Sequence, residues 1–243
     1  MEGHAVGMKY LVWDFDGTLA YRPGGWAGAL LEILGEEMPG REVEQDLLRS
    51  SLRAGFPWHA PDTPHPELVV ADRWWAGLAP VLVRAFEAAG VDAALARAMA
   101  ERVRNVYTDP RSWRLYEDTV SALHLLSSLG WTHLVLSNHV PELGEIARGL
   151  GLDRHVARVF NSAESGYEKP NPRAFDGILE ATAGAEAVWM IGDSAEADVA
   201  GAESVGIPAI LVRKRRKGVE RHCEDLSGIS LIVEGVPVPG EKA

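Results

Sequence analysis

Disulfides, long apolar runs and an excess of positive charge are all missing from this chain of 243 residues. Its one cysteine, Cys223, cannot form an intrachain disulfide, so covalent cross-links play no part in folding. No apolar run reaches the roughly 18 residues that a membrane span requires, and we expect no membrane partner. Acidic residues outnumber basic ones by 35 to 24, for a net charge of −11. This balance argues against nucleic acid as a partner, because phosphate backbones need a basic footprint.

The start of the chain lacks the layout of a secretory signal peptide, a basic segment followed by an apolar one. We therefore expect a cytoplasmic protein, with residues 1–7 and 236–243 disordered. The remaining composition is ordinary for a folded protein, with 47% hydrophobic and 24% charged residues. The length permits a core domain together with a smaller one.

Short apolar runs alternate with helical patterns through most of the chain. The runs cover Lys9–Trp13, Thr132–Leu136, Arg158–Asn161, Val188–Ile191 and Ala209–Val212, and the helical patterns cover Asp118–Leu129, Pro141–Leu150, Pro172–Ala183 and Ala195–Val205. Such alternation predicts a parallel sheet with right-handed crossovers. The predicted fold class is α/β, with a Rossmann-like doubly wound core over residues 8–19 and 115–235. We expect Gly228–Glu234 to form a last edge strand.

Residues 20–114 interrupt this alternation. They contain four helical patterns and no predicted strand: Trp26–Leu34, Val43–Arg53, Leu68–Ala89 and Ala93–Tyr107. A strand-to-helix crossover needs far fewer residues. The segment is therefore predicted to form an inserted, all-helical cap domain. Five of the eight tryptophans fall in or beside it, and they could line a pocket or fill the core of the cap.

Two carboxylates stand at the end of the first predicted strand. Asp14 and Asp16 are two residues apart, so their side chains share a face if the strand continues, and Gly17 lets the backbone turn away after them. Open parallel sheets bind ligands at this edge. The pair suits a divalent cation and a phosphorylated substrate. Taken alone, however, Asp-x-Asp-Gly is also typical of a simple turn or a loose calcium loop.

Three further motifs follow in order. An apolar run ends at Ser137, Lys169 stands just ahead of a helix start, and another strand ends at Asp193, with Asp198 five residues on. With these four motifs the chain resembles the haloacid dehalogenase superfamily of phosphohydrolases, in the branch whose helical cap follows the first motif. The resemblance covers residues 8–213.

The resemblance implies the roles of the carboxylates and of the metal. Asp14 would be the nucleophile that forms an aspartyl phosphate, and Asp16 would be the general acid and base. The cofactor would be Mg²⁺, held by the carboxylates of Asp14 and Asp193 and by the main-chain carbonyl of Asp16. Asp198 would position the shell of the metal or the side chain of Lys169.

The remaining motif residues would hold the phosphoryl group. Lys169 would place a positive charge beside it as a further catalytic residue. The hydroxyl of Ser137, the backbone N–H of Asn138 and the side chain of Thr18 would donate hydrogen bonds to it or brace the loop around the nucleophile. His139 lies next to this group, and a structural histidine is as compatible with its position as a substrate contact.

Asp16 also bears on the reaction class. In the dehalogenase branch the residue two places after the nucleophile is not acidic, because a halide leaves without a proton, so an aspartate there favours phosphoryl transfer. A phosphonate-cleaving relative would need a lysine in the cap, and residues 20–114 contain none. The basic segment Arg213–Lys217 is interpreted as a solvated loop.

The predicted function is that of a Mg²⁺-dependent phosphatase acting on a small phosphorylated metabolite. A phosphomutase of the same superfamily and a non-catalytic binding protein on the same fold are the alternatives. The sequence leaves open the physiological substrate, the cap residues that touch it, and the choice between monomer and homodimer.

Overall fold

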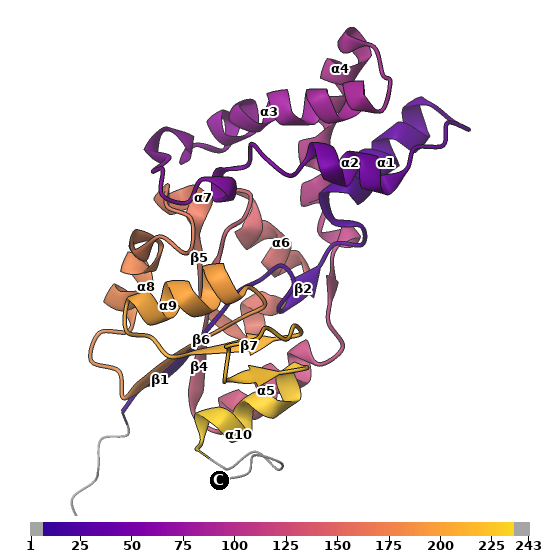
Figure 1. Ribbon diagram of the computed structural model, residues 1–243. Coiled ribbons are helices and arrows are strands. Elements are labelled where there is room, and N and C mark those ends of the chain that lie inside the picture. Colours follow the sequence, from indigo (N-terminus) through magenta and orange to yellow (C-terminus); the bar gives the residue numbers. More distant parts are fainter. Residues whose placement is uncertain (1–6, 236–243) are drawn as a thin grey trace, which may run out of the picture.

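A computed structural model describes residues 7–235. Its main body is a six-stranded sheet in which every neighbouring pair of strands is parallel (Figure 1). In spatial order the strands are β5 (Val156–Asn161), β4 (Trp131–Ser137), β1 (Lys9–Trp13), β6 (Ala187–Gly192), β7 (Ala209–Val212) and β8 (His222–Cys223). The first strand in the chain therefore lies near the middle, between β4 and β6. The predicted α/β class with a parallel sheet is confirmed.

Helices cover both faces of this sheet. They are α5 (Thr119–Ser128), α6 (Leu143–Gly149), α7 (Ser162–Ser165), α8 (Asp176–Ala181), α9 (Gly201–Ser204) and α10 (Ile229–Val233). Successive residues of β1 enter different cores: Leu11 and Trp13 pack into one apolar cluster, and Val12 into the other. This alternation follows from the two-residue period of a strand. It explains why strands buried on both faces are read in the sequence as continuous apolar runs.

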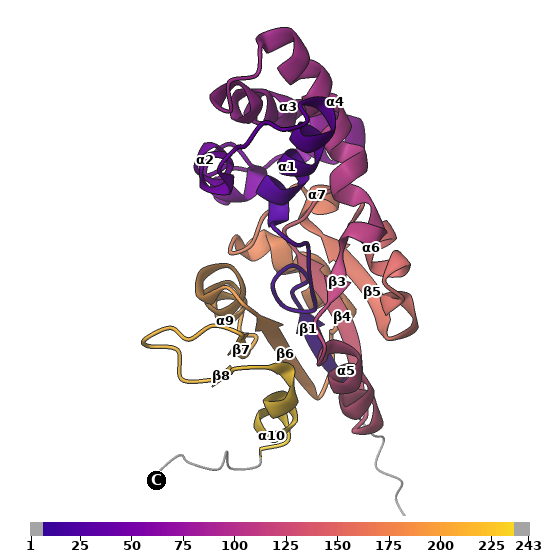
Figure 2. The same ribbon diagram turned by 90° about the vertical axis from the view of Figure 1, so that its right-hand side faces the viewer.

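A helical insertion lies over one end of the sheet, between β2 (Ala20–Tyr21) and β3 (Arg114–Leu115) (Figures 1 and 2). Its helices are α1 (Gly25–Glu37), α2 (Gln45–Ser51), α3 (Ala71–Ala88) and α4 (Ala93–Thr108). Asp92 begins α4 by accepting hydrogen bonds from the N–H groups of Ala94 and Leu95, at 3.0 and 3.1 Å. The prediction that residues 20–114 hold no strand is wrong at both ends, because β2 and β3 pair as a short antiparallel ribbon.

The expected edge strand at Gly228–Glu234 is also wrong. This segment forms a 3₁₀ turn, Leu226–Gly228, followed by α10. Asp225 accepts a hydrogen bond from the N–H of Ser227 at 2.9 Å, which starts the turn. Ile229 is fully buried, and Ile232 and Val233 pack against the same core, so the apolar spacing is helical. The short strand β8 occupies the edge of the sheet instead.

One further prediction differs from the structure in detail, and another falls mostly outside the described residues. The helix predicted over Ala195–Val205 begins as a π-helical turn, Ala195–Ala200, before it continues as α9. The ends predicted to be disordered lie outside the described residues, apart from Gly7.

Candidate active site

The predicted motif residues meet at the carboxyl edge of the central strands. Asp14 directly follows β1, Ser137 ends β4, and Asp193 directly follows β6. The register explains the meeting, because Trp13 of β1 is paired with Val135 on one side and with Ile191 on the other. Parallel strands thus deliver three polar side chains to one crevice, as expected for ligand sites in open α/β sheets.

Asp14 is held by hydrogen-bond donors from three segments. Its side chain is buried, and the whole residue is only 7% exposed. Ser137 Oγ and Lys169 Nζ donate to its Oδ1 atom at 2.9 and 2.8 Å. Thr18 Oγ1 lies 3.4 Å from Oδ2, so Thr18 braces the loop that follows β1. Oδ2 has the weaker contact and is the oxygen freer to react or to bind a cation.

Lys169 is a buried ammonium with all three N–H groups engaged. Nζ donates to Asp14 Oδ1, to the carbonyl of Leu136 and to Asp198 Oδ1, at 2.8, 2.7 and 2.6 Å. Burial alone would lower the pKa of Lys169, but the two carboxylates outweigh it and raise that pKa above its usual value. Lys169 is therefore a permanent positive charge beside Asp14.

The side chain of Asn138 fixes the backbone of this lysine, and Asn138 also lines the cavity. Its side chain donates to the carbonyl of Lys169 at 2.8 Å and accepts from the N–H of Lys169 at 2.7 Å. Asp198 is buried, accepts from Lys169, and also accepts from the N–H of Ser194 at 2.9 Å. Asp198 therefore holds the side chain of Lys169, which is one of the two roles predicted for Asp198.

Asp16 follows Asp14 by two residues and lines the cavity. Its side chain is exposed, yet the walls of the cavity surround it. Desolvation by these walls, together with the negative charges of Asp14 and Asp193, raises the pKa of Asp16 to about 7, and the charge of Lys214 opposes this shift. A carboxyl group with this pKa can carry a proton near neutral pH and can also give it up.

Asp193 closes the crevice from the β6 side. A Cβ atom on Gly17, whose φ is +89°, would lie 2.5 Å from Asp193 Oδ2, so this carboxylate fits where a side chain would otherwise stand. Lys214 forms an ion pair with the same Oδ2 atom. Burial and Asp14 raise the pKa of Asp193, and Lys214 opposes that shift.

Carboxylate oxygens of Asp14, Asp193 and Asp198 lie within 4.8 Å of one another. An all-oxygen set suits Mg²⁺, which prefers oxygen ligands and keeps several waters. Both oxygens of Asp198 accept hydrogen bonds, whereas Asp14 Oδ2 has only a weak contact and Asp193 faces an exposed lysine, so Asp14 and Asp193 are the pair better placed to bind a cation. The donor chemistry of the crevice therefore fits the predicted metal.

The basic segment Arg213–Lys217 was interpreted as a solvated loop. This interpretation is wrong for Arg213 and Lys214, which contact residues at or next to the site. Arg213 Nε donates to the carbonyl of Thr18 at 2.8 Å, and its guanidinium pairs with Asp118 at 2.7 Å. Lys214 contacts Asp193. The sequence pattern did not reveal these contacts, because they depend on the loop after β7 returning to the β1 edge.

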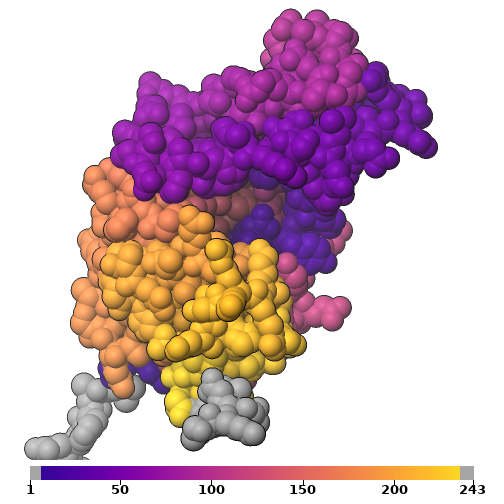
Figure 3. Space-filling model, in the orientation of Figure 1, coloured from indigo at the N-terminus to yellow at the C-terminus, as the bar shows by residue number. Residues whose placement is uncertain are grey.

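The helical insertion roofs the crevice and encloses a cavity of about 560 Å³. In the space-filling view a recess separates the indigo-to-magenta upper part from the orange-to-yellow lower part (Figure 3). The insertion lines the cavity with Trp26, Trp58, His59, Pro61 and Tyr107. The sequence left open whether the tryptophans of this segment line a pocket or fill its core. Trp26 and Trp58 line the cavity.

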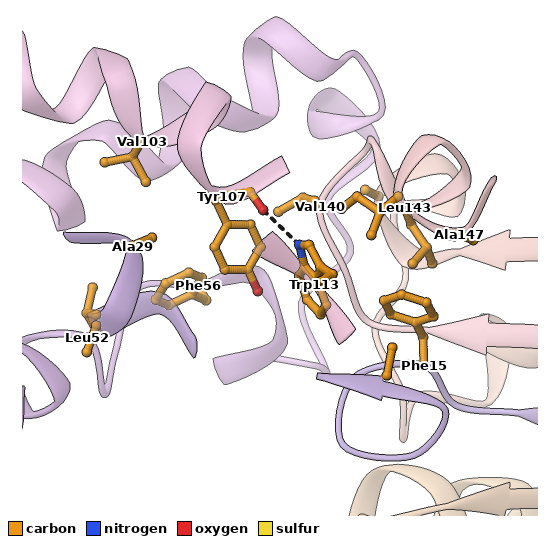
Figure 4. Close-up of a cluster of buried hydrophobic side chains, with 14 of the residues drawn as sticks. Phe15, Ala29, Leu52, Phe56, Val103, Tyr107, Trp113, Val140, Leu143 and Ala147 are labelled. Atoms are coloured by element: carbon orange, nitrogen blue, oxygen red, sulfur yellow. Dashed lines mark hydrogen bonds between the residues drawn. The ribbon is translucent and has the colours of Figure 1, made fainter. Parts of the chain in front are cut away.

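The other tryptophans near the insertion are core residues. Trp74, Trp75 and Trp113 are buried. Trp113 Nε1 donates to the carbonyl of Tyr107 at 2.9 Å, a contact drawn in Figure 4. His139 lines the cavity and packs against Phe15 and Trp113, with ring centroids 5.4 and 5.2 Å away. Burial lowers the pKa of His139 to about 4, so its ring is neutral at pH 7.

Direct contacts tie the insertion to the loop that carries Lys169. The N–H of His65 donates to the carbonyl of Gly166 at 2.8 Å, and Asn171 Nδ2 donates to the carbonyl of Pro61 at 3.0 Å. Both partners in the core lie within three residues of Lys169.

Across residues 7–235, no helix is both long and apolar enough to cross a membrane.

Comparisons with known proteins place the chain in a family. The family model for haloacid dehalogenase-like hydrolases matches residues 8–206. Haloacid dehalogenase-like hydrolase domain-containing protein 3 of Bos taurus is 29% identical over 220 residues, covering 86% of this chain and 83% of that protein. Phosphoserine phosphatase of Thermus thermophilus is 32% identical over 228 residues, covering 84% and 88%.

Among solved structures, the putative HAD-hydrolase YfnB of Bacillus subtilis, bound to magnesium, superposes with a TM-score of 0.71 at 18% identity, over 94% of this chain and 99% of that one. L-2-haloacid dehalogenase of Xanthobacter autotrophicus gives a TM-score of 0.66 at 18% identity, over 95% and 100%. At such identities these structures support the fold alone. The family match, which spans most of the chain, shows that this protein belongs to the haloacid dehalogenase-like hydrolases.

Proposed function

We propose that this protein is a Mg²⁺-dependent phosphatase that hydrolyses a small phosphorylated metabolite through an aspartyl-phosphate intermediate. The observation that carries the proposal is the pair of carboxyl groups in different environments. Asp14 is fixed by Ser137 and by a permanent ammonium, whereas Asp16 faces the cavity with a pKa raised to about 7. One group is suited to attack, and the other to exchange protons.

In the first half-reaction a carboxylate oxygen of Asp14 attacks phosphorus, and the bond from phosphorus to the ester oxygen breaks. Asp16 gives its proton to the departing oxygen, so an alcohol leaves. Lys169 and the hydroxyl of Ser137 keep Asp14 oriented while negative charge shifts on the phosphoryl oxygens.

In the second half-reaction Asp16, now a carboxylate, takes a proton from a water molecule as that water attacks phosphorus. The bond from phosphorus to the Asp14 oxygen breaks, which regenerates Asp14 and releases inorganic phosphate. Asp14, Asp193 and the main-chain carbonyl of Asp16 would hold Mg²⁺, which when bound neutralises charge between the phosphoryl group and the carboxylates.

We also propose that residues 20–114 act as a cap over the 8–19 and 115–235 core. The insertion lines the cavity with aromatic side chains, and its loop contacts flank Lys169. A roof of this kind excludes water from the reacting centre when substrate is bound. The proposed partner is a small phosphorylated molecule that fits beneath this roof.

The first experiment measures phosphate release from a panel of phosphorylated metabolites with Mg²⁺ and with EDTA. Asp14→Asn should abolish release, and Asp46→Asn, a change at an exposed ion pair on α2, should not. Full turnover by Asp14→Asn would remove the nucleophile assignment. Undiminished turnover in EDTA would remove the metal.

A second experiment separates phosphate transfer from dehalogenation. Asp16→Ala should abolish hydrolysis of alkyl phosphates and slow p-nitrophenyl phosphate less, because nitrophenolate leaves without a proton. Equal losses on both would make Asp16 structural. Chloride release from 2-chloropropionate would instead indicate the dehalogenase reaction, and interconversion of sugar phosphates without release would indicate a phosphomutase.

A further inference from the structure

The cavity wall contributed by the insertion is a set of aromatic rings fixed against one another. Trp26 and Tyr107 stack with their ring centroids 3.7 Å apart and their planes 14° apart. Trp58 stacks on Phe56 at 4.7 Å, and its centroid lies 6.4 Å from that of Trp26. The rings come from α1, α4 and the turn Pro57–His59, so packing within the insertion holds them in place. Such a wall offers preorganised apolar area to a ligand.

The opposite wall is strongly negative. Five carboxylates line the cavity: Asp14, Asp16, Asp193, Glu196 and Asp198. Within residues 7–235, Lys169 is the single lysine or arginine in the lining, and all three of its N–H groups already have acceptors around Asp14. The phosphoryl group of a substrate would lie next to this ammonium, so the charge of Lys169 would not be available to a second anion.

The other basic groups nearby do not offer a second positive site. Lys214 lies outside the lining, and its ammonium is already paired with Asp193. Burial lowers the pKa of both His59 and His139, so neither ring is a cation at neutral pH. Arg22 lies 5.9 Å from the centroid of the Tyr107 ring and outside the lining, and its side chain is paired with Glu32 at 2.7 Å. A second anion on a substrate would therefore sit among carboxylates and aromatic rings without a partner.

We propose, on the basis of the phosphatase function above, that the substrate is a phosphomonoester whose leaving alcohol is uncharged and carries an apolar ring. The phosphoryl group lies at Asp14 and Lys169, and the ring lies against Trp26, Trp58 and Tyr107. Phosphomonoesters whose leaving group bears a carboxylate or a second phosphate are rejected. The substrate class thus differs from the one named for the phosphoserine phosphatase relative, because phosphoserine carries a carboxylate.

The test uses leaving groups matched in shape. Benzyl phosphate and 4-carboxybenzyl phosphate differ by one anionic group, and ethyl phosphate lacks the ring. We expect kcat/KM for benzyl phosphate to exceed that for the carboxylated ester by roughly 100-fold and that for ethyl phosphate by roughly tenfold. Comparable values for the benzyl and carboxybenzyl esters, or faster turnover of O-phosphoserine than of benzyl phosphate, would overturn the inference.

Two variants tie the preference to the aromatic wall. Trp58→Ala should raise KM for benzyl phosphate and reduce the benzyl-to-ethyl ratio toward one, whereas Trp58→Phe should keep most of the ratio. A ratio unchanged in Trp58→Ala would remove the ring from this wall. Circular dichroism of both variants shows whether the fold is intact.

Acetyl phosphate, which has no ring and an activated leaving group, separates the two proposals. If acetyl phosphate and every ester fail to give release that depends on Asp14, the phosphatase function falls and the substrate class falls with it. If acetyl phosphate is hydrolysed but the carboxybenzyl ester is as good as the benzyl ester, the substrate class alone is wrong. Binding of benzylphosphonate against 4-carboxybenzylphosphonate to Asp14→Asn, followed by tryptophan fluorescence, gives the same ranking without turnover.

Discussion

The sheet body and the helical insertion treat their buried polar groups differently. In the sheet body Trp13 Nε1 donates to His133 Nδ1 at 3.0 Å, and Lys169 satisfies all three of its donors. Among the described residues, the buried side-chain atoms without a hydrogen-bond partner belong to the insertion or to core residues beneath it: Arg22, His65, Trp74, His139 and Glu168.

Such groups cost stability, so their grouping at one seam needs a physical reason. Ligand sites and parts that move against each other are the places where proteins tolerate unmet polar groups. The sheet edge therefore fixes its polar groups through hydrogen bonds, whereas the seam leaves several of its polar groups without partners.

Lys169→Met should be the most damaging single change on the rigid side. It leaves Asp14 and Asp198 buried as two unpaired carboxylates, because both accept from this ammonium and Lys169 is only 2% exposed. We expect the free energy of unfolding to fall by roughly 3–5 kcal/mol, measured by urea denaturation in EDTA.

The control for this variant is Lys9→Met, which breaks the more accessible pair between Lys9 and Glu234. Its expected cost is below about 1 kcal/mol, because solvent screens such pairs. Equal costs for the two variants would mean that the buried pair is not a special feature of the sheet edge.

His133 should make the sheet body sensitive to acid. Its Nδ1 atom accepts from Trp13, and its Nε2 atom lies 3.0 Å from the carbonyl of Leu123, so the neutral ring with hydrogen on Nε2 satisfies both contacts. Burial lowers the pKa of His133 to about 4 from 6.5. The unfolded chain binds a proton in this window and the folded protein does not, so stability is full above pH 6.5 and is lost as the pH falls toward 4.

The variant His133→Gln removes this titration. The loss attributable to His133 is at most about 3–4 kcal/mol, because its pKa falls from 6.5 to about 4 and each pH unit corresponds to about 1.36 kcal/mol. Urea midpoints recorded from pH 4 to pH 8 should therefore decline less steeply in the variant, and the difference at pH 8 measures the changed packing and hydrogen bonds without titration. Parallel curves for the two proteins would show that His133 is not the acid-sensitive group.

A matched pair of tryptophans compares the two regions directly. Trp13 of the sheet and Trp74 of the insertion are both buried, but Trp74 Nε1 has no hydrogen-bond partner. Replacement by Phe removes similar volume from each. Trp13→Phe should cost about 1–2 kcal/mol more than Trp74→Phe, because it leaves His133 Nδ1 without its donor. If Trp74→Phe is the costlier change in urea denaturation, the contrast between the regions is wrong.

The same contrast explains what the sequence could predict. The predicted bounds of β1 and β7 agree with the structure at both ends of each strand. A short apolar run bounded by turn residues has few possible structures other than a buried strand. The residues at strand ends converge for the same reason, since parallel pairing brings Asp14, Ser137 and Asp193 to one edge. Local patterns and topology together were enough for this half of the cavity.

Other features depend on contacts between distant segments, which no local pattern records. Asp118 precedes α5 directly, as the helical pattern predicts, but its carboxylate does not cap that helix and accepts from Arg213 and from the N–H of Leu226. Trp26 and Trp58 line the cavity while Trp74 does not, and no local pattern in the sequence marks this difference. Only the packing of the insertion decides between these positions.

The smallest predicted effect concerns Lys214, which reaches the rigid edge from an exposed loop. Its ammonium pairs with Asp193, one of the two carboxylates that fit Mg²⁺, so it occupies an oxygen that the metal would use. Lys214→Met should tighten Mg²⁺ binding, measured by titration calorimetry without substrate. The gain should be no more than about fivefold, because the Lys214 side chain is 65% exposed and water screens the pair.

The control is Arg215→Met, which breaks the pair between Arg215 and Glu224 and should leave the Mg²⁺ affinity unchanged. The difference should shrink as salt is raised. Weaker Mg²⁺ binding in Lys214→Met would instead mean that the lysine organises Asp193 for the metal, and that the rigid edge extends into the 213–217 loop.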